Sequence, residues 1–314
     1  MLAAQTHSVI VPVCNSEGSL DNLVKRLAQV LPGVSREFEV ILVNDGSRDR
    51  SWDVVCSIAQ EYSWVRGINL MRNFGQHNAT LCGIRAARHE VIITIDDDLQ
   101  IPPEEIPKLL DRLTEGHDIV YGTPSSAQHG LWRDLASKLT KLALQTAMGA
   151  ETARSVSAFR AFRARLRDAF SSYQGPFVSI DVLLTWGTTR FAAVPVRHEP
   201  RRIGASNYTF RMLVTHAVNM ITGFSTLPLQ LASLIGFACA LFGLVVLVFV
   251  VGRYFLLGYS VPGFPFLAST IAILSGAQMF ALGIIGEYLA RMHFRMMERP
   301  TYVVRSTTGL GQAQ

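Results

Sequence analysis

The segment Val91-Ile92-Ile93-Thr94-Ile95-Asp96-Asp97-Asp98-Leu99-Gln100 decides the fold. Its first half is almost entirely apolar, which is typical of a strand buried on both faces of a parallel sheet. Its second half places three adjacent carboxylates at the end of that strand. Ligands bind parallel α/β sheets at the carboxyl ends of the strands, so the segment predicts a buried strand with a ligand site at its end.

Strand-like and helix-like segments alternate through the residues before this one. The expected strands are Ser8–Val13, Phe38–Val43 and Val65–Leu70, and the expected helices are 20–31, Ser51–Glu61 and His77–Arg88. The connections are too long for hairpins, so the pattern predicts an α/β fold with a mostly parallel sheet and helices on both faces. No glycine-rich dinucleotide or P-loop motif follows the first strand, which argues against a dehydrogenase or a P-loop enzyme.

The three aspartates predict a metal site. Adjacent carboxylates repel one another, and a divalent cation is the simplest partner. On an extended backbone Asp96 and Asp98 share one face, and Gln100 adds a neutral oxygen, so the set suits Mg²⁺ or Mn²⁺ bridging a diphosphate. The alternative is that the cluster caps a helix opened by Pro102-Pro103-Glu104-Glu105.

The second half of the chain predicts a membrane part. The chain has 314 residues and is 49% hydrophobic, and between Arg211 and Glu287 its only charged residue is Arg253. Leu229–Val251 and Phe266–Leu289 are each long enough to cross about 30 Å of hydrocarbon, which takes about 20 apolar residues. As buried core helices, two such stretches would need a soluble core larger than the rest of the chain could cover. We therefore expect two transmembrane helices.

The arginines around these spans predict orientation. They follow the second span and precede the first, whereas the loop between the spans carries no charge, so both ends should face the cytoplasm. The segment Tyr208–Phe224 is amphipathic and is expected to lie in the membrane interface, with an ordinary surface helix as the alternative. We therefore expect a cytoplasmic catalytic domain (1–206), an interfacial helix (207–227), two transmembrane helices (228–290, spanning 229–251 and 266–289) and a cytoplasmic tail (291–314).

Charge and cysteine content exclude other classes. The net charge is +5, but the basic residues form no run with interleaved aromatics, so we expect membrane lipid and no nucleic acid as partner. The four cysteines have no metal-ligand or redox spacing and are expected to be reduced. Met1–His7 lacks the pattern of a signal peptide, which favours a cytosolic location for the first domain.

The ordered motifs resemble glycosyltransferase family 2, and within it the polyprenyl-phosphate glycosyltransferases. The resemblance covers nearly the whole chain and rests on Val11–Glu17, Val43–Ser47, Arg72–Ala79, Asp96–Gln100 with Pro102-Pro103-Glu104, Ser157–Arg160, Arg201–Tyr208, Gly286–Arg291 and Arg299–Tyr302. It implies a GT-A fold and an inverting transfer of a sugar from a UDP- or GDP-linked donor to a polyprenyl phosphate such as undecaprenyl phosphate. The product would be a lipid-linked monosaccharide for the cell envelope.

The resemblance also implies site residues. Donor contacts fall on Pro12, Asn15, Glu17, Asp45, Asn73, Gln76, His77, Asp96 and Asp97, and metal ligation on Asp96, Asp98 and Gln100. Acceptor and catalytic contacts fall on Arg133 with Ser137, on Arg201 with Ser206 as a second set, and on Arg160, Asp96 and Asp98. Asp181 is expected to contact donor sugar hydroxyls or to act as a weak base, with a structural carboxylate as the alternative.

The acceptor class bears on the mechanism. A lipid monophosphate has a second pKa of about 6, so its oxygen is already ionised near neutral pH and needs no dedicated base. Catalysis would then rest on positioning and on charge stabilisation by metal and arginines. A homo-oligomer packed through the spans and Thr301–Val304 is a further hypothesis. The alternative function is an inert membrane scaffold of a lipid-linked-sugar flippase complex.

Overall fold

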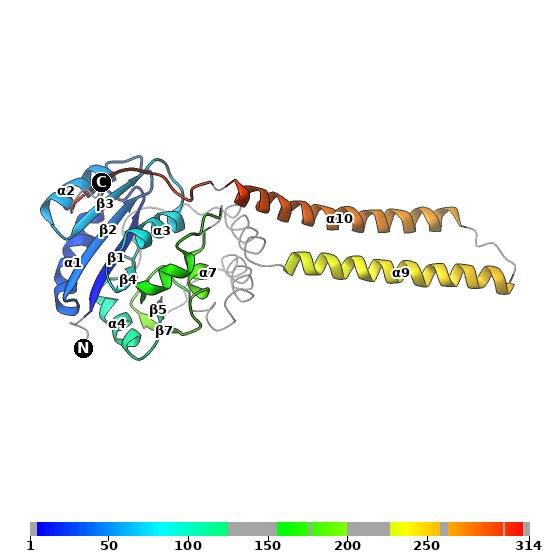
Figure 1. Ribbon diagram of the computed structural model, residues 1–314, viewed down its shortest axis with the longest axis horizontal. Coiled ribbons are helices and arrows are strands. Elements are labelled where there is room, and N and C mark those ends of the chain that lie inside the picture. Colours follow the sequence, from blue (N-terminus) through cyan, green and yellow to red (C-terminus); the bar gives the residue numbers. More distant parts are fainter. Residues whose placement is uncertain are drawn as a thin grey trace.

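The computed structural model describes residues 5–124, 156–175, 178–199, 227–257, 263–297 and 299–309. An eight-stranded sheet carries helices on both faces, and two long helices run out from it side by side (Figure 1). The predicted interfacial helix at 207–227 lies almost entirely outside the described residues.

The first half of the sheet is built from β-α units. They are β1 (Thr6–Val13), α1 (Leu20–Val34), β2 (Glu37–Asn44), α2 (Ser51–Glu61), β3 (Val65–Leu70), α3 (Gln76–Ala86) and β4 (Val91–Thr94). Strand β1 pairs in parallel with β2 and β4, and β2 pairs in parallel with β3. The predicted mostly parallel sheet is confirmed, and its first four strands end within two residues of their predicted positions.

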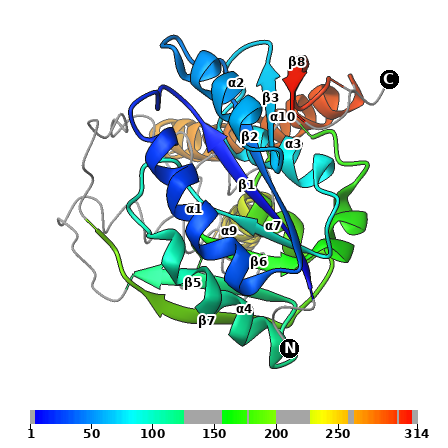
Figure 2. The same ribbon diagram turned by 90° about the vertical axis from the view of Figure 1, so that its left-hand side faces the viewer.

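The second half adds antiparallel pairs. It comprises η2 (Pro103–Glu105), α4 (Ile106–Thr114), β5 (Ile119–Pro124), β6 (Arg160–Arg163), η3 (Ala164–Phe170), α7 (Ile180–Thr185) and β7 (Phe191–Val196). Strand β6 runs antiparallel to β4 and β5, and β7 runs parallel to β5. The strand order is β7-β5-β6-β4-β1-β2-β3-β8, and the strands fan through the twist seen in Figure 2.

Both faces of the sheet are buried. Val9 and Val11 of β1 belong to the core that contains residues of α1, α2 and α4, whereas Ile10 belongs to the core under α3 and α7. Successive side chains of a strand point to opposite faces, so a strand covered on both sides must be apolar at nearly every position. This burial explains why the first four strands could be found from their apolar runs.

Two long helices and one more strand complete the chain. They are α9 (Leu227–Leu257), α10 (Phe264–Met296) and β8 (Val304–Thr308). The windows Leu229–Phe249 and Ile273–Ala290 are long and apolar enough to cross a membrane, and at most 6% of either window is buried within the protein. An exposed apolar surface of this extent fits lipid and not the interior of a soluble protein.

The chain after the second span returns to the sheet. Strand β8 pairs antiparallel with β3, and the amide of Met71 donates to the carbonyl of Val303 at 2.9 Å. We expected a cytoplasmic C-terminal tail at 291–314. In the structure α10 continues to Met296, and 304–308 form the outermost strand next to β3.

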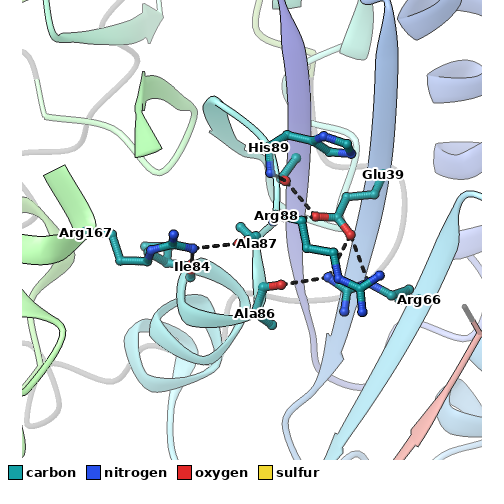
Figure 3. Close-up of polar contacts among 9 residues, drawn as sticks. Glu39, Arg66, Ile84, Ala86, Ala87, Arg88, His89 and Arg167 are labelled. Carbon is teal, nitrogen blue, oxygen red and sulfur yellow. Dashed lines mark hydrogen bonds and ion pairs between the residues drawn. The ribbon is translucent and has the colours of Figure 1, made fainter. Parts of the chain in front are cut away.

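Arginine side chains bind the C-terminal end of α3, which lies at the amino-terminal edge of the sheet (Figure 3). Glu39, which is 2% exposed, pairs with Arg66, and Arg66 also donates to the carbonyl of Ala86 at 2.7 Å. Arg167 donates to the carbonyl of Ala87 at 2.6 Å. Cations at a helix C-terminus satisfy its free carbonyls and oppose its dipole, so these contacts hold α3 with its first turn at the opposite edge of the sheet.

Candidate functional site

The turn after β2 holds the loop between β3 and α3. Gly46 has a φ of +62°, and a Cβ there would lie 2.4 Å from the amide nitrogen of Asn73, so only glycine fits. The Asp45 carboxylate accepts the amides of Phe74 and Gly75 at 2.7 and 2.8 Å. Asp45 is only 2% exposed, and burial raises its pKa while the two amides oppose the rise. Asp45 therefore organises the loop that leads into α3.

The loop after β1 is tied to the loop after β2. The Asn15 side-chain oxygen accepts the amide of Arg48 at 2.8 Å, and the Glu17 carboxylate accepts the amide of Arg50 at 3.0 Å. Asn15 itself has a φ of +55°, a conformation that asparagine tolerates better than most residues. These contacts place Asn15 and Glu17 together at the carboxyl edge of the sheet.

The three aspartates after β4 point to different partners. Asp97 accepts the hydroxyl of Ser16 and the amide of Cys14, so it holds the loop after β1, and burial raises its pKa. The carboxylate of Asp98 accepts the amide of Gln100 at 3.1 Å. Helix η2 has no side-chain cap, so the helix-capping alternative for the cluster is not what the structure shows.

Asp96 carries the strongest electrostatic signal of the three. Its carboxylate accepts the side-chain amide of Gln76 at 2.7 Å. Burial raises the pKa of Asp96 to about 7, and the negative charges of Asp98 and Asp97 act in the same direction, against Arg160. A carboxylate that is costly to ionise for these reasons is stabilised in its charged form by a nearby cation.

The carboxylate oxygens of Asp96 and Asp98 suit a metal ion that binds together with the phosphates of the substrate. Within the described ranges, no group of three or more His, Cys, Asp or Glu side chains could hold a metal ion alone. Mg²⁺ sites at phosphates commonly use one or two carboxylates and complete the shell with phosphate oxygens and water. Asp96 and Asp98 match that pattern, whereas Asp97 is engaged with Ser16.

A cavity of about 220 Å³ opens beside Asp96. Six residues expected from the sequence line it: Pro12, Gln76, His77, Asp96, Arg160 and Asp181. They come from the end of β1, the first turn of α3, the end of β4, the start of β6 and the first turn of α7. The topology thus gathers side chains that lie up to 169 positions apart, from Pro12 to Asp181, around one hollow.

A buried ion pair forms one side of this cavity. Arg160 and Asp181 are 3% and 6% exposed and contact each other directly. The Arg160 Nε donates to the Thr94 hydroxyl at 3.1 Å, and its guanidinium lies 5.9 Å from the centre of the Tyr121 ring. The hydrogen bonds and the pairing hold the guanidinium in place.

Sequence reasoning missed several lining residues. Thr80, Thr94 and Ser157 add hydroxyls to the cavity. Thr80 lies one helical turn after Gln76, so it shares that face of α3 and could have been found from helical spacing. Asn73 lies in the loop that Asp45 holds. Four expected acceptor contacts, Arg133, Ser137, Arg201 and Ser206, lie outside the described residues.

Comparison with known proteins assigns the chain. The sequence profile described as glycosyl transferase family 2 matches residues 8–173, just over half of the chain. This chain belongs to glycosyltransferase family 2. The matched residues include the loops after β1, β2 and β4 and the ion-paired Arg160.

Relatives within the family match over almost the full length. Undecaprenyl-phosphate 4-deoxy-4-formamido-L-arabinose transferase of Pseudomonas aeruginosa (strain LESB58) is 34% identical over 96% of this chain and 91% of its own. The transferase of the same name from Pectobacterium carotovorum subsp. carotovorum (strain PC1) is 33% identical over 96% of this chain and 93% of its own.

Solved structures support the fold. Glucosyl-3-phosphoglycerate synthase from Mycobacterium tuberculosis, crystallised with Mn²⁺, UDP-glucose and phosphoglyceric acid, superposes with a TM-score of 0.53 at 18% identity. The match covers 69% of this chain and 78% of that chain. The expected GT-A fold is confirmed by this likeness and by the sheet order.

Proposed function

We propose that this family-2 glycosyltransferase moves one sugar, with inversion, from a nucleotide-sugar to a polyprenyl phosphate such as undecaprenyl phosphate. The carrying observation is that relatives named as undecaprenyl-phosphate sugar transferases match over 96% of the chain, through both apolar helices. The product would be a lipid-linked monosaccharide for modification of cell-envelope glycans. These relatives are named as transferases, which gives no support to the inert-scaffold alternative.

The donor would lie across the carboxyl edge of the sheet. Its nucleotide would contact Pro12 at the end of β1 and the loops that carry Asn15, Glu17 and Asp45, and Asn73 would close one side. Its sugar would enter the cavity beside Asp96, where Gln76 and His77 line the wall. The contacts among these loops support the proposal, because they hold the expected donor residues in one connected surface.

Mg²⁺ or Mn²⁺ would be held by Asp96 and Asp98, with Gln100 beside them. When bound, the ion neutralises diphosphate charge and stabilises the departing nucleotide. The raised pKa of Asp96 and the absence of a three-ligand site among the described residues both favour a metal that arrives with the donor. The neighbour crystallised with Mn²⁺ and UDP-glucose is consistent with this.

The acceptor phosphate would attack without a dedicated base. Its oxygen is already ionised near neutral pH. Asp181 is directly paired with Arg160, so its carboxylate is already engaged by a guanidinium. Arg133 with Ser137, and Arg201 with Ser206, would contact the phosphate.

The membrane arrangement follows from the two spans. The catalytic domain and the C-terminal strand would face the cytoplasm, with α9 and α10 crossing the cytoplasmic membrane and placing the site near the lipid acceptor. We also propose a small homo-oligomer packed through the spans. Mass measurement of the detergent-solubilised protein that finds only monomer removes that part of the proposal.

The test uses membranes that contain the protein. They are incubated with radiolabelled UDP- and GDP-sugars, undecaprenyl phosphate and Mg²⁺ or Mn²⁺, and the lipid is extracted. Label should enter the lipid phase from one donor and be lost with EDTA and in Asp98→Ala. Nucleotide binding without lipid label from any donor points to a donor sugar outside the tested panel, and absence of nucleotide binding contradicts the transferase proposal itself.

A further inference from the structure

The cavity beside Asp96 has an unusual charge balance. Among the described residues that line it, two are carboxylates, Asp96 and Asp181, and Arg160 is the only lysine or arginine. The Arg160 guanidinium contacts Asp181 directly, and both side chains are almost fully buried. Its positive charge is therefore already compensated before a ligand enters.

A compensated arginine changes what the cavity can accept. A carboxylate on the ligand would face the oxygens of Asp181, and like charges brought together away from water repel each other. Uncharged hydroxyls meet no such penalty, because they donate to carboxylate oxygens and exchange hydrogen bonds with Thr80 and Ser157.

We propose that Asp181, by pairing with Arg160, makes this cavity a charge filter that admits uncharged donor sugars and rejects uronic acids. The inference rests on the proposed function, because it takes the cavity as the place of the donor sugar. It gives Asp181 a role in specificity, with Arg160 as its fixed partner. Removing the Asp181 charge while keeping its shape leaves Arg160 uncompensated, ready to pair with a sugar carboxylate.

The first measurement needs no variant. Binding of UDP, UDP-glucose and UDP-glucuronic acid, and of GDP, GDP-mannose and GDP-mannuronic acid, is measured on the full chain in detergent with Mg²⁺. For whichever nucleotide binds, the uronic acid form should bind at least about tenfold more weakly than the neutral form. Equal affinity for the two forms overturns the filter.

The second measurement uses Asp181→Asn. In this variant the ratio of the affinity for the neutral donor to the affinity for the uronic acid donor should fall by about tenfold or more. The affinity for the nucleotide alone should stay unchanged. The double variant Arg160→Gln with Asp181→Asn removes both charges and should not show the gain in uronic acid binding. An identical preference in the parent and in Asp181→Asn overturns the proposal.

A matched control separates charge from stability. Glu39→Gln also breaks a buried carboxylate–arginine pair, with Arg66 (Figure 3). Glu39 and Arg66 lie near the starts of β2 and β3, at the edge of the sheet opposite the cavity. The variant should lower thermal stability and leave donor preference as in the parent. A change of preference in Glu39→Gln equal to that in Asp181→Asn shows a general effect of instability and also overturns the filter.

The two proposals fail in different ways. If the parent binds neither nucleotide, the proposed function is contradicted and the filter falls with it. If the parent binds a nucleotide and transfers a sugar to lipid, but Asp181→Asn leaves the neutral-to-uronate ratio unchanged, the filter alone is contradicted.

Discussion

Asp45 connects two loops through a single side chain. Both of its oxygens accept backbone amides, so Asp45→Asn replaces one acceptor with an amino group that faces another donor. We expect a loss of about 1–3 kcal/mol of stability and a higher KM for the donor, because Gln76 and His77 follow directly from the loop. Chemical unfolding and donor KM measure the two effects. Asp53→Asn, an exposed change on α2, is the control and should alter neither.

His7 makes the stability of the domain depend on pH. It is fully buried in β1, and neither ring nitrogen has a hydrogen-bond partner within the described residues. Burial, with a smaller effect of His89, lowers its pKa to about 4. As the pH falls, His7 of the unfolded chain therefore gains a proton near pH 6.5, whereas His7 of the folded chain gains it only near pH 4. The free energy of unfolding is therefore highest above about pH 6.5 and decreases as the pH falls from 6.5 to about 4.

His7→Leu should remove that dependence. Between pH 7 and pH 5 the parent should lose about 2 kcal/mol more unfolding free energy than the variant. Denaturant unfolding of the detergent-solubilised chain at the two pH values gives the difference. His198→Gln, at an exposed position, should follow the parent, and a His7→Leu chain with the parent's full pH dependence contradicts the assignment.

Sequence reasoning identified the acidic residues of the site, and also Gln76 and Arg160, but not which side chains contact each other. Asp45, Asp96 and Asp181 were each singled out, because a carboxylate at a strand or helix end is visible in a sequence. Their partners Phe74, Gln76 and Arg160 lie 20 to 29 positions away and meet them only through the sheet order. Contacts of this kind follow from topology, and a periodic pattern does not encode them.

Among the elements, burial decided which strands were predictable. Strands β1 to β4 are covered on both faces and consist mainly of apolar residues. Strands β6 and β8 contain Arg160, Arg163 and the polar run Val304–Thr308, and they owe their extended form to pairing with a neighbour. Their sequences resemble loops until the neighbouring strand is known.

The segment just before β8, which contains Thr301 and Tyr302, contacts α3. The ring of Tyr302 lies 5.7 Å from the guanidinium of Arg85, and Thr301 accepts a hydrogen bond from the same arginine. Tyr302→Ala should remove this contact and destabilise the catalytic domain by about 1–3 kcal/mol, given the loss of partly buried aromatic surface and of the cation–π contact. Thr307→Ala, at an exposed position of β8, should have little effect. Thermal unfolding that ranks the two variants equally contradicts the contact.

In the whole molecule, the two apolar helices α9 and α10 lie between β7 and β8, which both belong to the sheet of the catalytic domain. Helices of 31 and 33 residues are about 46 and 50 Å long, which exceeds about 30 Å of hydrocarbon. Two spans return the chain to the side from which it left. The pairing of β8 with β3 fits this arrangement, because a strand can join the sheet only on the side where the sheet lies.

Thiol labelling tests the sidedness. Cys14 is exposed on the catalytic domain, whereas Cys82 is buried and its pKa is raised to about 12 by that burial. A membrane-impermeant maleimide at mildly alkaline pH should label Cys14 only after cells are permeabilised. In a Cys14→Ser chain, Gly263→Cys, just before α10, should be labelled in intact cells. Labelling of Cys14 in intact cells contradicts a cytoplasmic catalytic domain.

The place of β8 in the sheet sets an order of events during biosynthesis. A ribosome makes β1 to β7 first, then both spans, and only afterwards the strand that covers β3. Until then the edge of β3 presents unpaired amides and carbonyls, the kind of edge that recruits other strands. The sheet is therefore completed only after both apolar helices have been synthesised. If those helices fail to insert into the membrane, the edge of β3 stays unpaired and accessible to chaperones and proteases.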